Sequence, residues 1–318
     1  MPFNSLREFI SRLDAMGELK RVTVEADPVL EITEIADRVG KAGGPALLFE
    51  KVKGSSFPLL INAFGSYRRM ETALGCAHLD EIGDRIEKLL SMRPPEGLRE
   101  KIRALLALKD IAAVMPRKVK KAPCHELVHE EGPLLDTLPI LTCWPGDGGP
   151  YITLPIVVTR DPDTGVQNYG MYRMQKFDGR STGMHWQYNK DGARHYEKYR
   201  AMNRRMEVAV ALGGPPAVTY ASTAPLPPDI DEMLFAGWLE GRPVELVKCL
   251  SLDLYVPAQS DFVIEGYVDP GDERVEGPFG DHTGFYSAAD VYPVFHVTRI
   301  CHRRDAVYPA TIVGKPPM

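Results

Sequence analysis

The stretch Glu276-Gly-Pro-Phe-Gly-Asp281-His-Thr-Gly-Phe-Tyr286 is the starting point for both the fold and the function of this chain. It combines two carboxylates five residues apart with three glycines, a proline and a histidine. Neither helical nor strand periodicity explains this order, and Gly-Pro with spaced glycines indicates an ordered loop. Two acids on a shaped loop form a candidate acid/base pair if their surroundings separate the two pKa values. The alternative is a tight turn with two solvated acids.

The composition is that of a globular protein with room for two domains. The 318 residues are 44% hydrophobic and 25% charged, with a net charge of −5, which argues against nucleic-acid binding. No apolar run approaches the ~18 residues of a membrane span, and the N-terminus lacks the pattern of a secretory signal. Five scattered cysteines without C-x-x-C spacing predict neither a zinc site nor disulfides, so we expect a reducing cytoplasm.

The first 115 residues alternate helical and strand patterns. A capping box at Ser5–Glu8 predicts a helix that ends at Gly17. Amphipathic spacing predicts further helices over residues 30–39, 79–90 and 98–108. Short apolar runs predict strands over residues 19–24, 46–49 and 59–63. This alternation is typical of a small α/β domain.

The chain turns strand-rich after the basic segment Pro116–Lys121, which is either a solvated linker or a phosphate-binding patch. Helices are predicted over about 194–208 and 229–239. Many short strands with Gly/Pro turns favour a barrel or a sandwich. Neither a Rossmann fingerprint nor a P-loop is present. The predicted strands cover residues 152–159, 168–175, 217–222, 244–250, 262–268, 293–300 and 306–313.

Unusual polar residues occur in the stretch Asn168-Tyr-Gly-Met-Tyr-Arg173. On a regular strand Asn168 and Arg173 face opposite sides, so a bulge or a strand end must intervene if both serve one site. Arg173 beside a carboxylate would hold that acid ionised and present a fork to an anionic substrate. The alternative is a surface arginine.

Two further stretches have an open interpretation. Met184-His-Trp-Gln187 with Lys190-Asp191 either stacks on a ring and binds a phosphate, or supplies a buried tryptophan with a satisfied histidine. In Pro227-Pro-Asp-Ile-Asp-Glu232, Asp229 or Asp231 is expected to cap a helix. Glu232 either stabilises that helix start or binds a divalent cation together with the Asn168 amide oxygen.

Together these stretches resemble the UbiD family of reversible decarboxylases, which use prenylated FMN. The resemblance covers essentially the whole chain in order. It rests on Asn168-x4-Arg173, Met184-His-Trp, Pro-Pro-Asp-x-x-Glu232, Glu245-Leu-Val-Lys-Cys249, Asp253-Leu-x-Val-Pro257, Glu265-Gly and the Glu276–Gly284 motif.

The resemblance implies a fold and a site. It implies an N-terminal α/β domain over residues 1–115 and a split β-barrel, similar to flavin reductases, over 116–318. The family's catalytic residues fall on Arg173, Glu276 and Asp281. Its metal ligands fall on Asn168 and Glu232, for manganese with a potassium-like monovalent cation nearby. Its cofactor contacts fall on Asn168, Met171, Tyr172, Arg173, His185, Trp186, Gln187, Lys190 and Asp191.

The implied activity is reversible decarboxylation of an aromatic or α,β-unsaturated acid, with prenylated FMN as the electron sink. A flavin prenyltransferase would supply the cofactor. We expect Arg173 to hold Glu276 ionised. Asp281 is expected to deliver the proton, so it must be protonated for part of the cycle, and burial near Glu276 would favour this.

The chain departs from the family in two ways. Part of the family has a histidine metal ligand near Lys190-Asp191, and whether His195 replaces it stays open. Members usually continue into a C-terminal α/β domain that supports dimerisation, whereas this chain stops at Met318, so we expect a truncated chain that is a homo-oligomer only at full length. The alternatives are a non-catalytic fragment and a plain FMN-dependent oxidoreductase.

Overall fold

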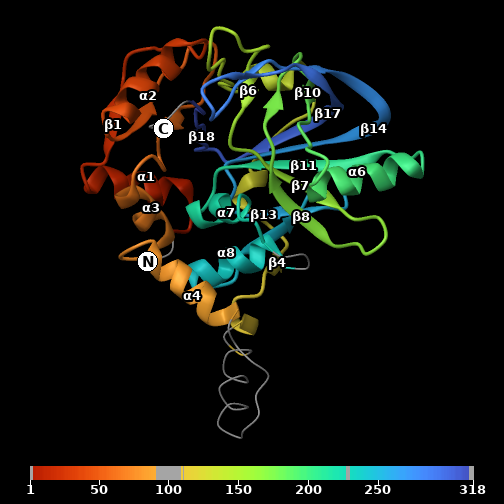
Figure 1. Cartoon of the computed structure of the whole chain (residues 1–318), viewed down its shortest axis with the longest axis horizontal. Coiled ribbons are helices and arrows are strands. Elements are labelled where there is room, and N and C mark those ends of the chain that lie inside the picture. The colour runs from red at the N-terminus through yellow and green to blue at the C-terminus, as the bar shows by residue number, and fades with distance from the viewer. Residues whose placement is uncertain (1–2, 91–108, 110, 227–229, 315–318) are drawn as a thin grey trace, which may run out of the picture.

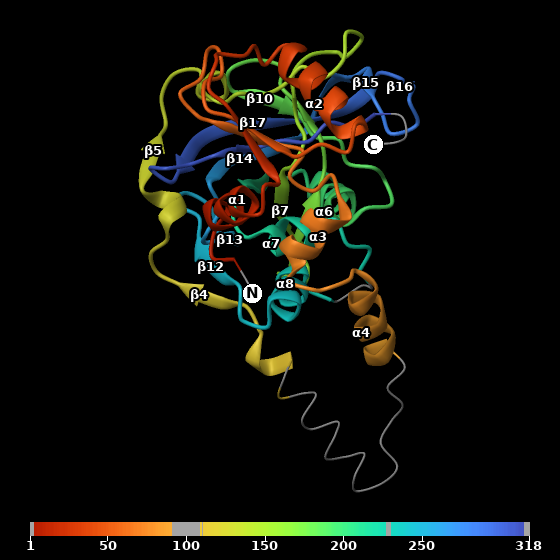
Figure 2. The same cartoon turned by 90° about the vertical axis from the view of Figure 1, so that its left-hand side faces the viewer.

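The computed structural model describes residues 3–90, 109, 111–226 and 230–314 (Figure 1). The N-terminal elements lie on one side of the molecule, and the long β14–β17 pair crosses the other side (Figures 1 and 2). The predicted helix over 98–108 lies outside the described residues. The elements up to residue 90 are α1 (Leu6–Ala15), β1 (Leu19–Val22), α2 (Glu31–Lys41), β2 (Ala46–Phe49), β3 (Leu59–Ile61), α3 (Tyr67–Leu74) and α4 (Asp80–Leu90).

The capping box predicted at the start of α1 is present in part. The Ser5 hydroxyl accepts a hydrogen bond from the Glu8 backbone N–H at 3.2 Å. The Glu8 carboxylate accepts the Asn4 backbone N–H at 2.7 Å. The two side chains therefore hold backbone donors at the start of the helix that have no partner within it.

A four-stranded sheet forms the core of the N-terminal region. Its order is β1-β2-β3-β18, where β18 is Tyr308–Pro309 near the end of the chain. β18 runs parallel to β3, and the Tyr308 N–H donates to the Pro58 carbonyl at 2.9 Å. The last described strand, β18, therefore belongs to the first sheet. The division into domains at residue 115 stays a prediction.

The largest sheet has the path β10-β17-β14-β11-β7-β8, with β5 also paired to β17. β14 occupies one edge of β17, so β10 and β5 share its other edge. The described strands form open sheets rather than a closed barrel, so the predicted flavin-reductase-like split barrel is not confirmed. The strands of this sheet are β5 (Leu127–His129), β7 (Ile156–Arg160), β8 (Gln167–Met171), β10 (Ser181–Gly183), β11 (Met206–Leu212), β14 (Phe262–Glu276) and β17 (Asp290–His302).

Smaller elements surround this sheet. A three-stranded sheet has the order β13-β12-β4, and the pairs β15-β16 and β6-β9 flank the region of the predicted site. None of the described helices is long and apolar enough to cross a membrane. These elements are β4 (Arg117–Val119), η1 (Pro123–His125), η2 (Leu134–Thr137), β6 (Tyr151–Ile152), β9 (Met174–Gln175), α6 (Asp191–Ala201), α7 (Pro216–Ala221), α8 (Glu232–Glu240), β12 (Glu245–Lys248), β13 (Tyr255–Pro257), β15 (Phe279–Gly280) and β16 (Tyr286–Ser287).

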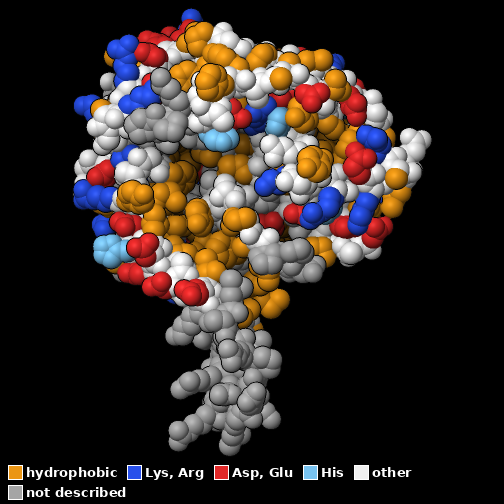
Figure 3. Space-filling view, viewed as in Figure 1, with side chains coloured by type: hydrophobic (Ala, Val, Ile, Leu, Met, Phe, Trp, Pro, Cys, Tyr) orange, Lys and Arg blue, Asp and Glu red, His pale blue; other side chains and the backbone are white. Residues whose placement is uncertain are grey.

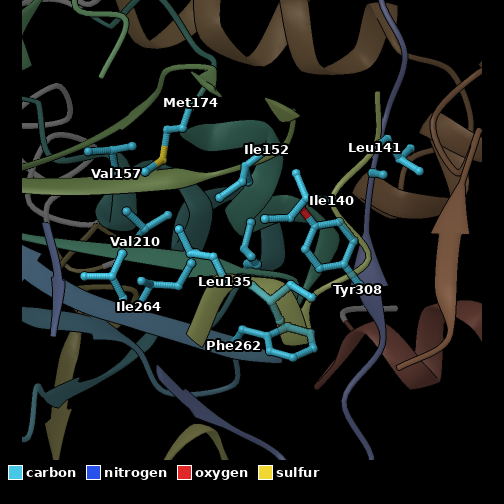
Figure 4. Packing of buried hydrophobic residues seen from close by; sticks show 14 of the residues in the cluster. Leu135, Ile140, Leu141, Ile152, Val157, Met174, Val210, Phe262, Ile264 and Tyr308 are labelled. Carbon is cyan, nitrogen blue, oxygen red and sulfur yellow. The ribbon is translucent and has the colours of Figure 1, made fainter. Parts of the chain in front are cut away.

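The central strand β11 is buried on both faces. Val208, Val210 and Leu212 point into one hydrophobic cluster, which also contains Phe262, Ile264 and Tyr308 (Figure 4). Ala209 and Ala211 point into the opposite cluster, which α7 and α8 cover. Alternation of side chains along a strand explains how one apolar run serves two cores. Burial on both faces makes this sheet a firm support for residues at its ends.

Two sequence predictions in this region were wrong. The segment predicted as a strand over 217–222 belongs to the helix α7 (Pro216–Ala221) and its C-cap Ser222, because Pro215 and Pro216 start a helix and α7 packs against α8. The helix predicted over 194–208 spans 191–201 instead, and its last residues belong to β11. Figure 3 shows hydrophobic side chains gathered in a hollow over α3, α7 and α8.

Asp261 ties three segments together at the start of β14. Its carboxylate is buried and accepts the Gly214 N–H at 2.9 Å and the Val307 N–H at 3.0 Å. A Cβ atom on Gly213 would lie 2.3 Å from Oδ2 of Asp261, so this turn requires glycine. Burial raises the pKa of Asp261 to about 6, although the two N–H groups lower it.

The raised pKa of Asp261 predicts that its contribution to stability depends on pH. Its folded pKa of about 6 lies above the unfolded value of about 3.9, which corresponds to roughly 3 kcal/mol. The contribution is full below about pH 4 and is lost as the pH rises to about 6. We expect the unfolding free energy of the wild type, relative to Asp261→Asn, to fall over this range in urea titrations. An exposed control, Asp84→Asn, should leave the pH dependence unchanged, and a flat difference for Asp261→Asn would contradict this prediction.

Candidate active site

Arg173 and Glu276 form a buried ion pair at the centre of the candidate site. β8 ends at Met171 and β9 begins at Met174, so Arg173 lies in the strand break that the sequence required. Its Nε and Nη2 donate to the two Glu276 oxygens at 2.9 and 3.2 Å, and Nη2 also donates to the Ser287 hydroxyl at 3.1 Å. The guanidinium lies 4.4 Å from the centre of the Phe279 ring. This fork fixes the orientation of both charged groups.

His185 completes the surroundings of Glu276. Its Nδ1 lies 3.0 Å from Oε2 of Glu276, and its ring packs on Tyr292 with centroids 4.3 Å apart. The Glu276 side chain is fully buried. Burial raises the pKa of Glu276, but the hydrogen bonds from His185 and Arg173 outweigh it, so the pKa lies below its ordinary value. Glu276 is therefore held as a carboxylate.

Asp281 lies at the mouth of this group. Its Oδ2 is 3.8 Å from Nη1 of Arg173, and its side chain is 32% exposed. Oδ1 accepts the His282 N–H at 2.8 Å and faces His282 Nδ1 at 2.9 Å. Burial raises the pKa of Asp281, but His282 and the charge of Arg173 lower it further. Burial thus favours protonation of Asp281 as expected, but in this conformation His282 and Arg173 together stabilise the carboxylate more strongly.

Asn168 and Glu232, the two predicted cation ligands, lie in hydrogen-bond contact. With its amide nitrogen toward Glu232, Asn168 donates to Oε1 at 3.0 Å and accepts the Gly170 N–H at 3.2 Å. The Tyr169 N–H donates to Oε2 at 3.2 Å. Asp231 caps α8 by accepting the N–H groups of Met233 and Leu234, and Asp229 lies outside the described residues. Burial raises the pKa of Glu232 to about 7, as for a carboxylate without a cationic partner.

These two residues fit a divalent cation but do not form a complete set of ligands by themselves. Glu232 offers a half-buried carboxylate, whereas the Asn168 amide would have to turn its oxygen from the Gly170 N–H to offer a second hard ligand. Among the described residues, no three His, Cys, Asp or Glu side chains converge into a metal site. His195 contacts other groups in this structure, since its Nδ1 lies 2.8 Å from the Thr159 hydroxyl and its Nε2 lies 3.9 Å from Asp161.

Several predicted cofactor residues lie near the Asn168–Glu232 pair and along the segment that leads to Arg173. The Tyr172 hydroxyl lies 3.4 Å from the Asn168 amide and accepts the Gly192 N–H at 3.2 Å. Trp186 is buried, and its indole N–H has no partner among the described residues. The exposed residues Gln187 and Lys190 form a turn in which the Lys190 N–H donates to the Gln187 carbonyl at 3.0 Å.

The remaining two cofactor residues flank this group. Asp191 is the first residue of α6, and its carboxylate pairs with Arg194. Met171 is half-buried, and its N–H donates to the Ser222 carbonyl at 3.0 Å. The segment from residue 168 to 173 therefore contacts Glu232 at one end and Glu276 at the other.

Sequence reasoning missed three supporting residues. Gln175 accepts the Gly277 N–H at 2.7 Å, Ser287 accepts from Arg173, and Asp147 accepts the Gly280 N–H at 2.8 Å. The glycine-rich stretch Trp144-Pro-Gly-Asp147-Gly-Gly was the available signal for the last of these. Two hollows, of about 260 Å³ beside Arg242 and about 240 Å³ beside Arg21, are lined by other residues.

The buried ion pair gives a prediction about stability. Replacing Arg173 by methionine leaves the Glu276 charge buried without its main compensation, so we expect Arg173→Met to lower the unfolding free energy by about 3–5 kcal/mol at pH 7. Adding Glu276→Gln removes that charge and should recover most of the loss. Urea denaturation of both variants measures this. A double variant no more stable than Arg173→Met would contradict it.

Comparison with known proteins identifies the family of this chain. Residues 117–316 match the Rift-related domain of 3-octaprenyl-4-hydroxybenzoate carboxy-lyase, and residues 10–86 match the N-terminal domain of that lyase. An uncharacterised protein of Archaeoglobus fulgidus is 51% identical over 319 residues, which cover 100% of this chain and 66% of the relative. One from Aquifex aeolicus is 48% identical over 318 residues, or 99% and 65%. The chain thus spans about two thirds of the length of these relatives.

Solved structures give the same result. The UbiD-class enzyme HmfF from Pelotomaculum thermopropionicum, in an evolved dimeric form in complex with prenylated FMN (prFMN), has a TM-score of 0.83 and 35% identity, covering 98% of this chain and 68% of that one. Vanillic acid decarboxylase from Sedimentibacter hydroxybenzoicus, in its closed form, has a TM-score of 0.86 and 31% identity, covering 99% and 65%. With a family match over more than half of its length, this chain belongs to the UbiD carboxy-lyase family.

Proposed function

We propose that this chain carries the catalytic residues of a prenylated-FMN-dependent decarboxylase. The observation that supports this most directly is the buried Arg173–Glu276 fork with Asp281 at its mouth. Its substrate would be an aromatic or α,β-unsaturated carboxylic acid, and the reaction would be reversible. The family membership and the prenylated FMN in the related HmfF structure support this reaction class.

The residues have separate roles in this proposal. Arg173 orients the departing carboxylate of the substrate, because its Nη1 is directed away from Glu276 toward Asp281. Glu276 keeps Arg173 and His185 in place through the fork and the 3.0 Å contact. Asp281 delivers the proton to the product carbon, since it is the partly exposed acid of the group. It must leave the His282 hydrogen bonds to be protonated.

The described residues fit the cofactor that the family implies. Asn168 and Glu232 would hold a manganese ion at the phosphate of the flavin, with a monovalent cation such as potassium nearby. Contacts with the flavin would come from the start of α6 and from the Trp186 N–H, which has no partner among the described residues. The other contacts would come from Met171, Tyr172, His185, Gln187, Lys190 and Asp191. When bound, prenylated FMN would supply the electron sink that no side chain provides.

Partners and location belong to the same proposal. A flavin prenyltransferase would supply the cofactor, and a full-length protein would be a homo-oligomer, as the dimeric form of HmfF illustrates for that relative. The division into domains at residue 115 and the cytoplasmic location stay predictions.

Asp281→Asn tests the proposed acid. We expect the variant to bind prenylated FMN, detected by its absorption spectrum and mass after co-expression with a flavin prenyltransferase. Its release of carbon dioxide from aromatic acids should fall by roughly 10²–10⁴-fold, since an amide cannot donate the proton of an acid. Asp163→Asn on an exposed loop is the control. An unchanged rate in Asp281→Asn would rule out this role, and an unaltered chain that binds only plain FMN would argue for an oxidoreductase.

Glu232→Gln tests the metal assignment. We expect manganese affinity, measured by electron paramagnetic resonance titration, to fall by roughly tenfold or more, because the amide removes a charged oxygen ligand. Asp231→Asn is a matched control, since asparagine also caps a helix and the neighbouring charge changes equally. Equal losses in both variants would show that general negative charge, rather than coordination by Glu232, attracts the ion.

A further inference from the structure

A second glycine-rich loop, residues 144–149, lies directly against the loop that carries Asp281. The Gly148 N–H donates to the Pro278 carbonyl at 2.7 Å, and the Gly146 N–H donates to the Tyr286 hydroxyl at 2.9 Å. These two hydrogen bonds hold the loop that carries Asp281 at Pro278, before Asp281, and at Tyr286, after it. None of these residues belongs to the predicted catalytic or cofactor set.

Asp147 makes the central connection between the two loops. Its Oδ1 accepts the Gly280 N–H at 2.8 Å, and its Oδ2 accepts the Trp144 N–H at 2.9 Å. Gly280 directly precedes Asp281. Each carboxylate oxygen thus holds one loop, and hydrogen bonds to an ionised acceptor are among the stronger ones in proteins.

The fit between the loops leaves no room for a side chain at Gly148 or Gly280. A Cβ atom on Gly148 would lie 2.2 Å from the Gly277 carbonyl oxygen, and one on Gly280 would lie 2.1 Å from Cδ1 of Trp144. Backbone packs on backbone and on the indole ring here, so the position of one loop fixes that of the other.

The second loop is itself held by the end of the described chain. The Trp144 indole N–H donates to the Val313 carbonyl at 2.7 Å. Figure 2 shows β15 and β16 beside this C-terminal segment. A continuous series of contacts therefore runs from Val313 through Trp144 and Asp147 to Gly280 and Asp281.

We propose that Asp147 is a positioning residue that holds Asp281 within reach of Arg173. Asp147 does not exchange a proton with substrate, because both of its oxygens face backbone N–H groups. Its carboxylate sets where the Gly280–Asp281 backbone lies, and this places Oδ2 of Asp281 3.8 Å from Nη1 of Arg173. This inference rests on the proposed function of Asp281.

Hydrogen exchange tests the structural part without any activity. In Asp147→Ala we expect backbone amides of residues 279–285 to exchange about tenfold faster, as loss of one charge-assisted hydrogen bond implies. Amides of β7 and β11 should keep their protection. Asp147→Asn, which keeps one acceptor oxygen, should give a smaller local increase, and Asp163→Asn should give none.

Kinetics of the full chain loaded with prenylated FMN tests the functional part. We expect Asp147→Ala to lower kcat about tenfold or more while KM changes less than about twofold, because substrate binding does not involve Asp147. Asp147→Asn should fall between the alanine variant and the wild type.

Three results would overturn the proposal. The first is unchanged exchange of the backbone amides of residues 279–285 in both variants. The second is faster exchange of these amides with an unchanged kcat. The third is an equal loss of protection throughout the chain in Asp147→Asn. If Asp147→Ala does not fold, Asp147→Asn alone decides between these outcomes. A fully active Asp281→Asn would instead remove the proposed function, while the exchange result would still report whether Asp147 holds the loop.

Discussion

A single buried charge, the Glu276 carboxylate, constrains the arrangement of the whole site. An ionised acid without solvent contact is stable only when cations and hydrogen bonds replace water. Arg173 and His185 do this from two different segments, and β14 brings Glu276 to them from a third. The strand break between β8 and β9 lets Arg173 serve the same site as Asn168, because a continuous strand would direct the two side chains to opposite faces.

The Asn168–Glu232 pair lies at the other end of the same short segment, and it is unlike the first group. Glu276 has a counter-charge, Arg173, within the chain, whereas Glu232 accepts hydrogen bonds from neutral donors. One carboxylate is therefore charge-balanced before any ligand binds and the other is not. This difference agrees with the proposed roles, in which Glu276 orders the catalytic group and Glu232 binds a cation together with a phosphate-bearing ligand.

The sequence singled out residues that lie together in the structure, but it misassigned elements around them. Arg173, Glu276 and Asp281 could be singled out because each belongs to a local motif with unusual residues. The break after Met171 followed from strand geometry. The helix α7 and the strand β11 were mistaken, since short apolar runs fit both periods and only packing decides between them. The contact of Asp147 with Gly280 joins two loops that are 133 residues apart in the sequence, and no local pattern encodes such a pairing.

The pairing of β18 with β3 has a consequence for how the protein is made. Tyr308 aligns with Leu59, so the first sheet takes its fourth strand from a segment that is synthesised about 250 residues after β3. Until then β3 presents an unpaired edge, and the cluster that contains Phe49, Ile61 and Tyr308 stays open. The first sheet can therefore be completed only after residues 308–309 have left the ribosome, which makes this pairing a late, non-local step of folding.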